Sequence, residues 1–158
     1  MTREKWRIIG EIVGLVAIVA SLLMVAIELK QNTDMTRAQI IQSRADTAID
    51  LADTFYNSDH MPGIFVKAVN GQQLSEEEAA RYRFWIRASL RNQDNNLQQY
   101  NQGLLGDHIP RAIANSVRNI VVQSSVSRQY WAENKVGYSD EFVEFVEIAL
   151  SENSEDAE

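Results

Sequence analysis

The stretch IIGEIVGLVAIVASLLMVAIEL, residues 8–29, decides the fold of this 158-residue chain. Its only charged residues are Glu11 and Glu28, near its two ends. A helix that spans a bilayer needs roughly 20 mostly apolar residues at about 1.5 Å of rise per residue. The stretch therefore predicts one membrane-spanning helix, and we expect Trp6 and Lys30 to anchor it at the two interfaces.

A cleaved signal peptide is the alternative interpretation, because the basic residues Arg3, Lys5 and Arg7 precede the apolar stretch. We expect a retained anchor instead, since no A-x-A-type cleavage site follows the stretch and the chain begins at Met1. The basic tail alone favours an N-terminus in the cytoplasm. It is nearly balanced by the basic residues after the stretch, which are Lys30, Arg37 and Arg44.

The composition predicts an all-α protein of about one domain. Only two Pro and seven Gly interrupt the chain, which leaves long stretches suited to helices. We expect a membrane anchor with a basic tail over residues 1–31 and a small helical bundle over residues 32–150. The last stretch, SENSEDAE at residues 151–158, is too acidic and too poor in apolar residues to fold alone, so we expect a disordered tail.

Several classes of function are disfavoured by the same composition. A net charge of −7 argues against a nucleic-acid partner, because binding to phosphates needs a clustered basic surface. The chain has no Cys, and its two His have no spacing typical of a zinc site or a carboxylate-bridged site. No catalytic or phosphate-binding motif is present. We therefore expect no catalytic residues, no metal and no cofactor.

Small residues form a stripe along the apolar stretch. They recur at spacings of four, three and four residues, which places them on one helix face, and they are Gly10, Gly14, Ala17 and Ser21. Such a stripe lets two helix backbones approach closely in lipid. The sequence therefore favours self-association or docking onto another membrane helix, over a chance arrangement of residues that are common in membrane helices.

The two charged residues of the stretch allow two interpretations. Glu28 continues the small-residue stripe, so in an oligomer it would form a ring of carboxylates at the mouth of a pore. The alternative is that Glu28 only reaches the polar interface, as we expect for Glu11, whose partner would be Arg7 four residues earlier.

Periodic apolar residues predict further helices after the membrane stretch. The first, over residues 35–56, either continues the membrane helix or begins anew at a cap within residues 32–34. The others are expected at residues 63–69, from a capping box of Ser75 and Glu78 to about residue 102, and at residues 110–124, 126–133 and 140–150. The helix stops are Gly71 and Gly103, and the caps are Asp107 and Ser139. For the amide-rich stretch at residues 92–102 we favour a solvated face with Gln93 buried over a polar helix interface.

Three motifs resemble those of a family of uncharacterised bacterial single-pass membrane proteins. VAIELKQNT, residues 25–33, is similar to the family's junction SLxYxxxQIRQNT. QYNQGLLGD, residues 99–107, resembles YQYREGLLDE, and RQYWAENKVGYSDEFVEFVE, residues 128–147, resembles WWxxxxxxFSPEFxxFV. The chain departs from the family at Glu28, where the family has Gln or a neighbouring polar residue, and at Asn101 and Gln102, where an Arg–Glu pair is common.

The resemblance implies an N-terminal membrane helix, a compact helical domain and a bacterial inner membrane, with the domain in the cytoplasm. Two functions then remain open. One is a membrane-anchored scaffold or interaction protein that self-associates, or that is a subunit of a larger membrane complex. The other is a homo-oligomeric, channel-like assembly with Glu28, and with it Glu11, at the pore. In both, the lipid bilayer is a partner.

Overall fold

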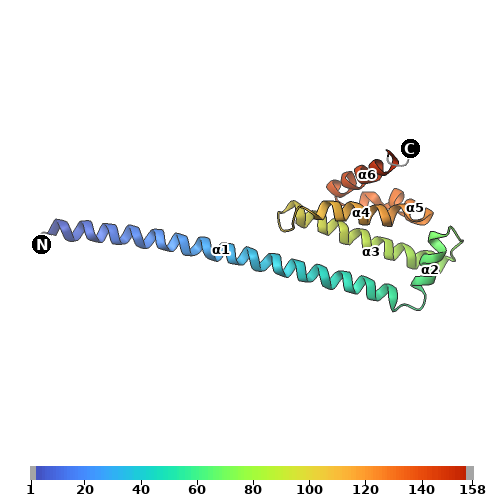
Figure 1. Ribbon diagram of the computed structural model, residues 1–158, viewed down its shortest axis with the longest axis horizontal. Helices are drawn as coiled ribbons and strands as arrows, with labels where there is room; N and C mark the ends of the chain where they lie inside the picture. The colour runs from blue at the N-terminus through green and yellow to red at the C-terminus, as the bar shows by residue number, and fades with distance from the viewer. Residues whose placement is uncertain (1–2, 156–158) are drawn as a thin grey trace. The chain divides into compact units, whose positions relative to one another are not determined.

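The computed structural model describes residues 3–155 of the chain (Figure 1). These residues form six α-helices and one short 3-10 helix, and no strand occurs among them, so the all-α prediction is confirmed. The helices are α1 (Arg3–Tyr56), α2 (Met61–Val69), α3 (Glu76–Asn101), α4 (Ile109–Val122), α5 (Ser125–Asn134) and α6 (Asp140–Glu155), with η1 (Lys135–Gly137) between α5 and α6. By contacts, the chain divides into two compact units, Met1–Arg44 and Ala45–Glu158.

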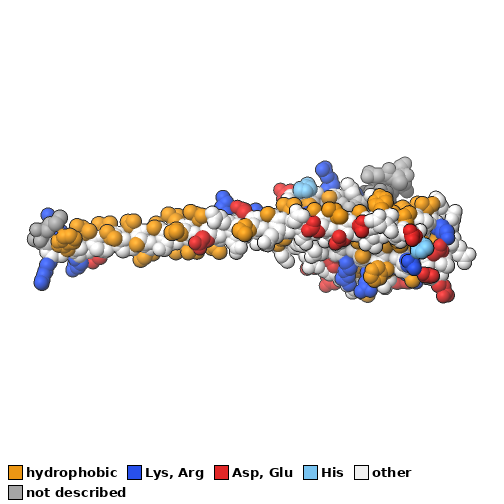
Figure 2. All heavy atoms as spheres, turned by 90° about the horizontal axis from the view of Figure 1, so that it is seen from below, with side chains coloured by type: hydrophobic (Ala, Val, Ile, Leu, Met, Phe, Trp, Pro, Cys, Tyr) orange, Lys and Arg blue, Asp and Glu red, His pale blue; other side chains and the backbone are white. Residues whose placement is uncertain are grey.

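The first unit is helical and strongly apolar. Among the described residues, α1 is the one helix long and apolar enough to cross a membrane. No residue of its most apolar 18-residue window is buried within the chain, and large side chains such as Leu15 are exposed (68%). Figure 2 shows hydrophobic side chains along this segment and basic side chains near its N-terminal end. Length and composition are those of a membrane-spanning helix.

The helix α1 continues without a break through the residues where a fresh helix could have begun. The hydroxyl of Thr33 donates to the carbonyl oxygen of Leu29 at 3.0 Å, and that of Thr36 donates to Asn32 at 2.9 Å. These are bonds to carbonyls four residues earlier, which a Thr makes inside a helix, whereas a capping Thr accepts from a backbone N–H. Of the two alternatives for this junction, the continuous helix is the one that the structure contains.

The second unit is a bundle built around α3 and α4, which lie side by side (Figure 1). The helix α5 packs against both, α2 packs against α3, and α6 packs against α4. Each helix contributes apolar residues at spacings of three and four to one shared core. The most deeply buried members of this core are Tyr82, Ile86, Leu90, Ile113, Val117, Phe142 and Val146.

Local signals set most helix ends. The helix α2 stops before Gly71 (φ +68°) and α3 stops before Gly103 (φ +72°), as predicted. Both glycines adopt the left-handed conformation that side chains with a Cβ rarely tolerate. Pro110 lies in the first turn of α4, and the hydroxyl of Ser139 accepts from the backbone N–H of Phe142 at 3.3 Å.

Two predicted boundaries differ from the structure. His108, and not Asp107, is the residue before α4, and it makes no side-chain capping bond, so the prediction of an Asp107 cap is wrong. The helix α6 runs to Glu155, past the predicted end at residue 150. Arg118 explains the extension, because its Nε donates to the carbonyl of Ala149 and its Nη2 binds Glu152, each at 2.6 Å. The start of the predicted tail is therefore helical, and residues 156–158 lie outside the described residues.

The capping box of α3 gives a stability prediction. The Ser75 hydroxyl accepts from the backbone N–H of Glu78 at 3.2 Å, and the Glu78 carboxylate accepts from the backbone N–H of Ser75 at 2.8 Å. Ser75→Ala removes the first bond and should lower the free energy of unfolding by about 1 kcal/mol. Urea unfolding in detergent micelles, followed by circular dichroism, measures the loss. Ser125→Ala, in the first turn of α5, is the matched control, and an equal loss for both variants would contradict the prediction.

Candidate functional site

The predicted association residues share one face of α1. At about 100° per residue, Gly10, Gly14, Ala17 and Ser21 fall within an arc of about 60°. A Cβ placed on either glycine would meet no atom of the chain within 4 Å. The Ser21 hydroxyl donates to the carbonyl of Ala17 at 2.9 Å, so its proton is used within the helix. This face is smooth, and its backbone is open to an approaching helix.

The predicted charged and anchoring residues lie on the same helix. Glu28 is 18 residues after Gly10, which is about five turns, so it lies in line with the small-residue face. Glu11 lies about 100° from Gly10 and pairs with Arg7 at 3.6 Å, which confirms its predicted partner. Trp6 and Lys30 are exposed on either side of the apolar segment.

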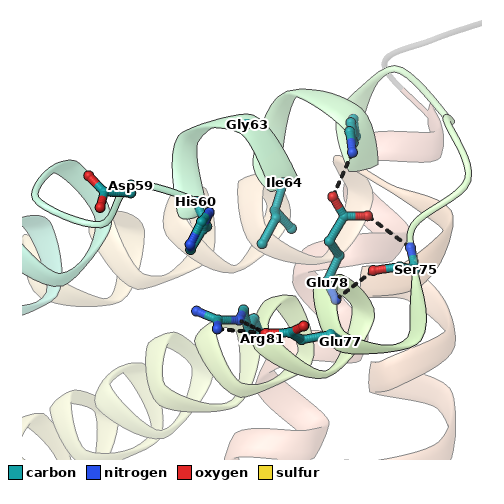
Figure 3. Close-up of a pocket in the computed structure, with 9 residues that line it drawn as sticks. Asp59, His60, Gly63, Ile64, Ser75, Glu77, Glu78 and Arg81 are labelled. Atoms are coloured by element: carbon teal, nitrogen blue, oxygen red, sulfur yellow. Dashed lines mark hydrogen bonds and ion pairs between the residues drawn. The ribbon is translucent and has the colours of Figure 1, made fainter.

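A polar cleft of about 620 Å³ opens between α2 and the start of α3 (Figure 3). At one end, Lys67 Nζ donates to Glu78 Oε1 at 2.5 Å, and Asp59 and His60 lie at the other end. This hydrogen bond holds the pKa of Glu78 below its ordinary value of 4.5. On the wall of the cleft, Arg81 pairs with Glu77 at 2.7 Å. The Lys67–Glu78 pair fastens α2 to α3, whereas the Arg81–Glu77 pair lies within α3.

Three buried hydroxyls form a second polar cluster, which the sequence did not indicate. Ser124 donates to the Tyr82 hydroxyl at 3.3 Å and lies 2.9 Å from Ser127 Oγ. Ser124 also caps α5 by accepting from the backbone N–H of Ser127 at 3.1 Å. A serine nucleophile needs an adjacent base, and within residues 3–155 the hydrogen-bond partners of these hydroxyls include neither a His nor a carboxylate. The cluster joins α3 to α5.

The amide-rich end of α3 also differs from the expectation of a solvated face with Gln93 buried. Gln93 is half-buried, while Asp94 and Asn96 are the buried polar residues. Asp94 Oδ1 accepts from Ser139 Oγ at 2.7 Å and from Gln98 Nε2 at 3.1 Å. Because these bonds satisfy the carboxylate, the stretch fastens α3 to the start of α6.

Next to Asp94, Arg91 contacts the loop before α6. Its Nη2 donates to the carbonyl of Gly137 at 2.6 Å, and its guanidinium carbon lies 4.4 Å from the ring centre of Tyr138. Burial, together with the hydrogen bond to Tyr130, raises the pKa of Tyr138 well above 10.0. Tyr138 is therefore held protonated, as a packing residue would be.

An apolar groove of about 390 Å³ runs between the end of α1 and α3 and α4. Phe55, Phe65 and Trp85 form its aromatic wall, with ring centres 5.4 to 6.0 Å apart. Gln123 also lines it, and Gln123 Nε2 is buried without a hydrogen-bond partner among the described residues. The aromatic contacts attach the end of α1 to the bundle.

No metal-binding cluster is present in the part of the chain that the structure describes, where no three His, Cys, Asp or Glu side chains converge. The two histidines lie apart, at the starts of α2 and α4, and neither makes a side-chain capping bond.

Comparisons with protein-family models, with curated proteins and with solved structures give no match to this chain. The family resemblance therefore stays a prediction. The candidate site that remains is the open face of α1 at residues 10–21, in line with Glu28.

Glu147 gives a prediction about pH. Its Oε1 accepts from Lys135 Nζ at 2.9 Å and from Trp131 Nε1 at 3.0 Å. The Lys135 bond is the main reason that the pKa of Glu147 lies below 4.5 in the folded protein. The stabilisation is therefore complete above about pH 4.5 and is lost as the pH falls through the lower, folded pKa.

Glu147→Gln should flatten this part of the acid limb of the stability curve, as measured by thermal unfolding in micelles between pH 3 and pH 7. Glu144→Gln, an exposed neighbour on α6, is the control. If both variants keep the full acid dependence, Glu147 does not contribute to it.

Proposed function

We propose that this chain is a membrane-anchored helical scaffold or interaction protein that self-associates through α1. The observation that carries the proposal is the open face of Gly10, Gly14, Ala17 and Ser21 on an apolar helix that buries none of its own residues. In lipid, helix association depends on close packing and on hydrogen bonds rather than on a hydrophobic driving force. A smooth face that the chain does not use itself is what such packing requires.

The helical domain supports a role in interaction more than in catalysis. In its polar cleft Lys67 pairs with Glu78 and Arg81 pairs with Glu77, and its buried hydroxyls and carboxylate bond to one another or to nearby helices. The proposal therefore assigns the domain no reaction, cofactor or nucleic-acid partner. Its partners are the lipid bilayer and either further copies of the chain or the subunits of a larger membrane complex. Following the family resemblance, we place the anchor in a bacterial inner membrane with the domain in the cytoplasm.

The packing of α1 can be tested with a matched pair of variants. Gly14→Ile puts a branched side chain on the open face and should dissociate the oligomer. Leu15→Ile changes a residue about 140° from Gly10 and should leave the oligomer intact. Native mass spectrometry of chains extracted with their lipids gives the subunit number for each variant.

Equal effects of the two substitutions would contradict packing through this face. If the wild-type chain instead has a constant ratio to another membrane protein, the chain is a subunit of that protein's complex.

A second candidate function rests on the position of Glu28. Because Glu28 lies in line with the packing face, an oligomer of α1 would bring several carboxylates together near one end of the membrane segment. Rings of acidic side chains select cations in channels. The alternative is thus a homo-oligomeric channel-like assembly with Glu28 at its mouth and Glu11 near the other end of the segment.

Planar-bilayer recordings test this alternative. Glu28→Gln should shift the reversal potential measured in a KCl gradient towards lower cation selectivity, because the carboxylates that attract cations are removed. Glu144→Gln, in the helical domain, should not shift it. A wild-type protein that assembles but carries no current would exclude the pore and leave the scaffold.

A further inference from the structure

A basic face with an aromatic centre lies on α3. Arg83, Arg87 and Arg91 follow one another at intervals of four residues, and Phe84 lies among them. Phe84 is strongly exposed (71%), because it lies on the side of α3 opposite the core of the bundle. In the described part of the chain neither Arg83 nor Arg87 forms an ion pair. This basic face stands out in a chain whose net charge is −7.

An acidic face of similar length lies on the last turns of α1. Asp46, Asp50 and Asp53 recur at intervals of four and three residues. Ile49 (64% exposed) and Tyr56 (77% exposed) lie among and beside them. This acidic face and the basic face of α3 both belong to the unit Ala45–Glu158.

The two faces match in length and in charge. At about 1.5 Å per residue, residues 46–53 span about 10.5 Å and residues 83–91 span about 12 Å. With the two helices antiparallel, Asp53 and Asp50 come opposite Arg83 and Arg87. Arg91, at the end of the basic face, is bound to Gly137 and Asp94 of its own chain. Phe84 then lies near the apolar side chains of the acidic face, so the contact would bury aromatic surface as well as pair charges.

The two faces of one chain cannot meet each other. Phe55 points towards α2 and α3, because its ring centre lies 5.4 Å from that of Phe65 on α2 and 6.0 Å from that of Trp85 on α3. Asp53 and Asp46 lie about 160° and 180° around α1 from Phe55, so they point away from α3. The acidic face of one chain therefore cannot bind the basic face of the same chain, whereas it can reach that of a second copy.

We propose that the basic face of α3 in one copy of this chain binds the acidic face of α1 in a second copy. The inference deepens the proposed self-association, on which it rests, by placing a second interface in the helical domain. The interface pairs unlike faces, so each copy offers one of each kind. Contacts of this type close into a pair that uses both contacts or into a ring.

Site-directed cross-linking tests the contact directly, because the chain has no Cys of its own. Two full-length chains with different tags, one with Asp50→Cys and one with Arg87→Cys, are reconstituted together in liposomes and oxidised. We expect a cross-linked product that carries both tags. The matched control replaces Asp50→Cys by Glu144→Cys, an exposed acidic position on α6. Equal yields for the two pairs would overturn the proposal.

Charge reversal gives an independent test. A chain with Asp50→Arg and Asp53→Arg, or one with Arg83→Asp and Arg87→Asp, should self-associate at least about tenfold more weakly than wild type. A mixture of the two variants should recover the association, because opposite charges face each other again at one contact. About 1 M NaCl should weaken the wild-type contact. A mixture that stays as weak as either variant overturns the proposal, provided that circular dichroism shows both to be folded.

The same liposomes distinguish the contact between the apolar helices from the contact between α3 and α1. Self-cross-linking of an Ala17→Cys chain reports contact between membrane helices. If that product forms while the Asp50→Cys and Arg87→Cys product does not, the proposed function stands and this inference fails. If only the second product forms, the domain contact stands without the membrane-helix contact. If neither forms, both fail.

Discussion

The structure depends on an apolar surface that the chain does not bury. Side chains of the first unit, from Ile8 to Leu29, are exposed along the whole length of the segment. In water such exposure costs about 25 cal/mol per Å² of apolar area, whereas in lipid it costs nothing comparable. The α-helix suits that environment because its backbone N–H and C=O groups bond within the segment. What remains for specificity is shape, and the small residues at positions 10–21 give α1 a face on which another helix can pack.

The second unit is stabilised by the opposite arrangement, a core closed to water with polar groups that bond to one another. Asp94 shows the principle, because a buried carboxylate costs free energy unless its oxygens accept hydrogen bonds, and Ser139 and Gln98 supply them. The hydroxyls of Tyr82, Ser124 and Ser127 do the same between α3 and α5. Polar groups that satisfy one another in this way hold the helices of the bundle together.

Two kinds of surface therefore point to association, and they work by different physics. In the apolar segment of α1 the proposed contact would rely on close approach of backbones, which salt hardly affects. In the helical domain it would rely on opposite charges around exposed aromatic side chains, which salt screens. A weak charged contact between domains gains strength when the anchors already hold the copies together, because the second contact then forms at a high effective concentration.

The sequence by itself determined the features that depend on neighbours a few residues away. Apolar length predicted a helix long enough to span a membrane, Ser75 and Glu78 predicted the start of α3, and Gly71 and Gly103 predicted two helix stops. These features could be predicted because hydropathy, caps and left-handed turns are local. The candidate association residues also came from spacing alone, and the structure added that their face is open.

Tertiary structure decided what depends on distant parts of the chain. Thr33 is consistent with a cap and with a helix interior, and only its bond to Leu29 distinguishes the two. From the sequence alone, Asp94 is expected to be solvated. In the structure it is buried and accepts a hydrogen bond from Ser139, which is 45 residues later. Likewise, the charges of Asp53 and Arg87 are plain in the sequence. That their faces cannot meet within one chain follows only from the contact of Phe55 with Trp85, because side-chain packing sets the direction in which each helix face points.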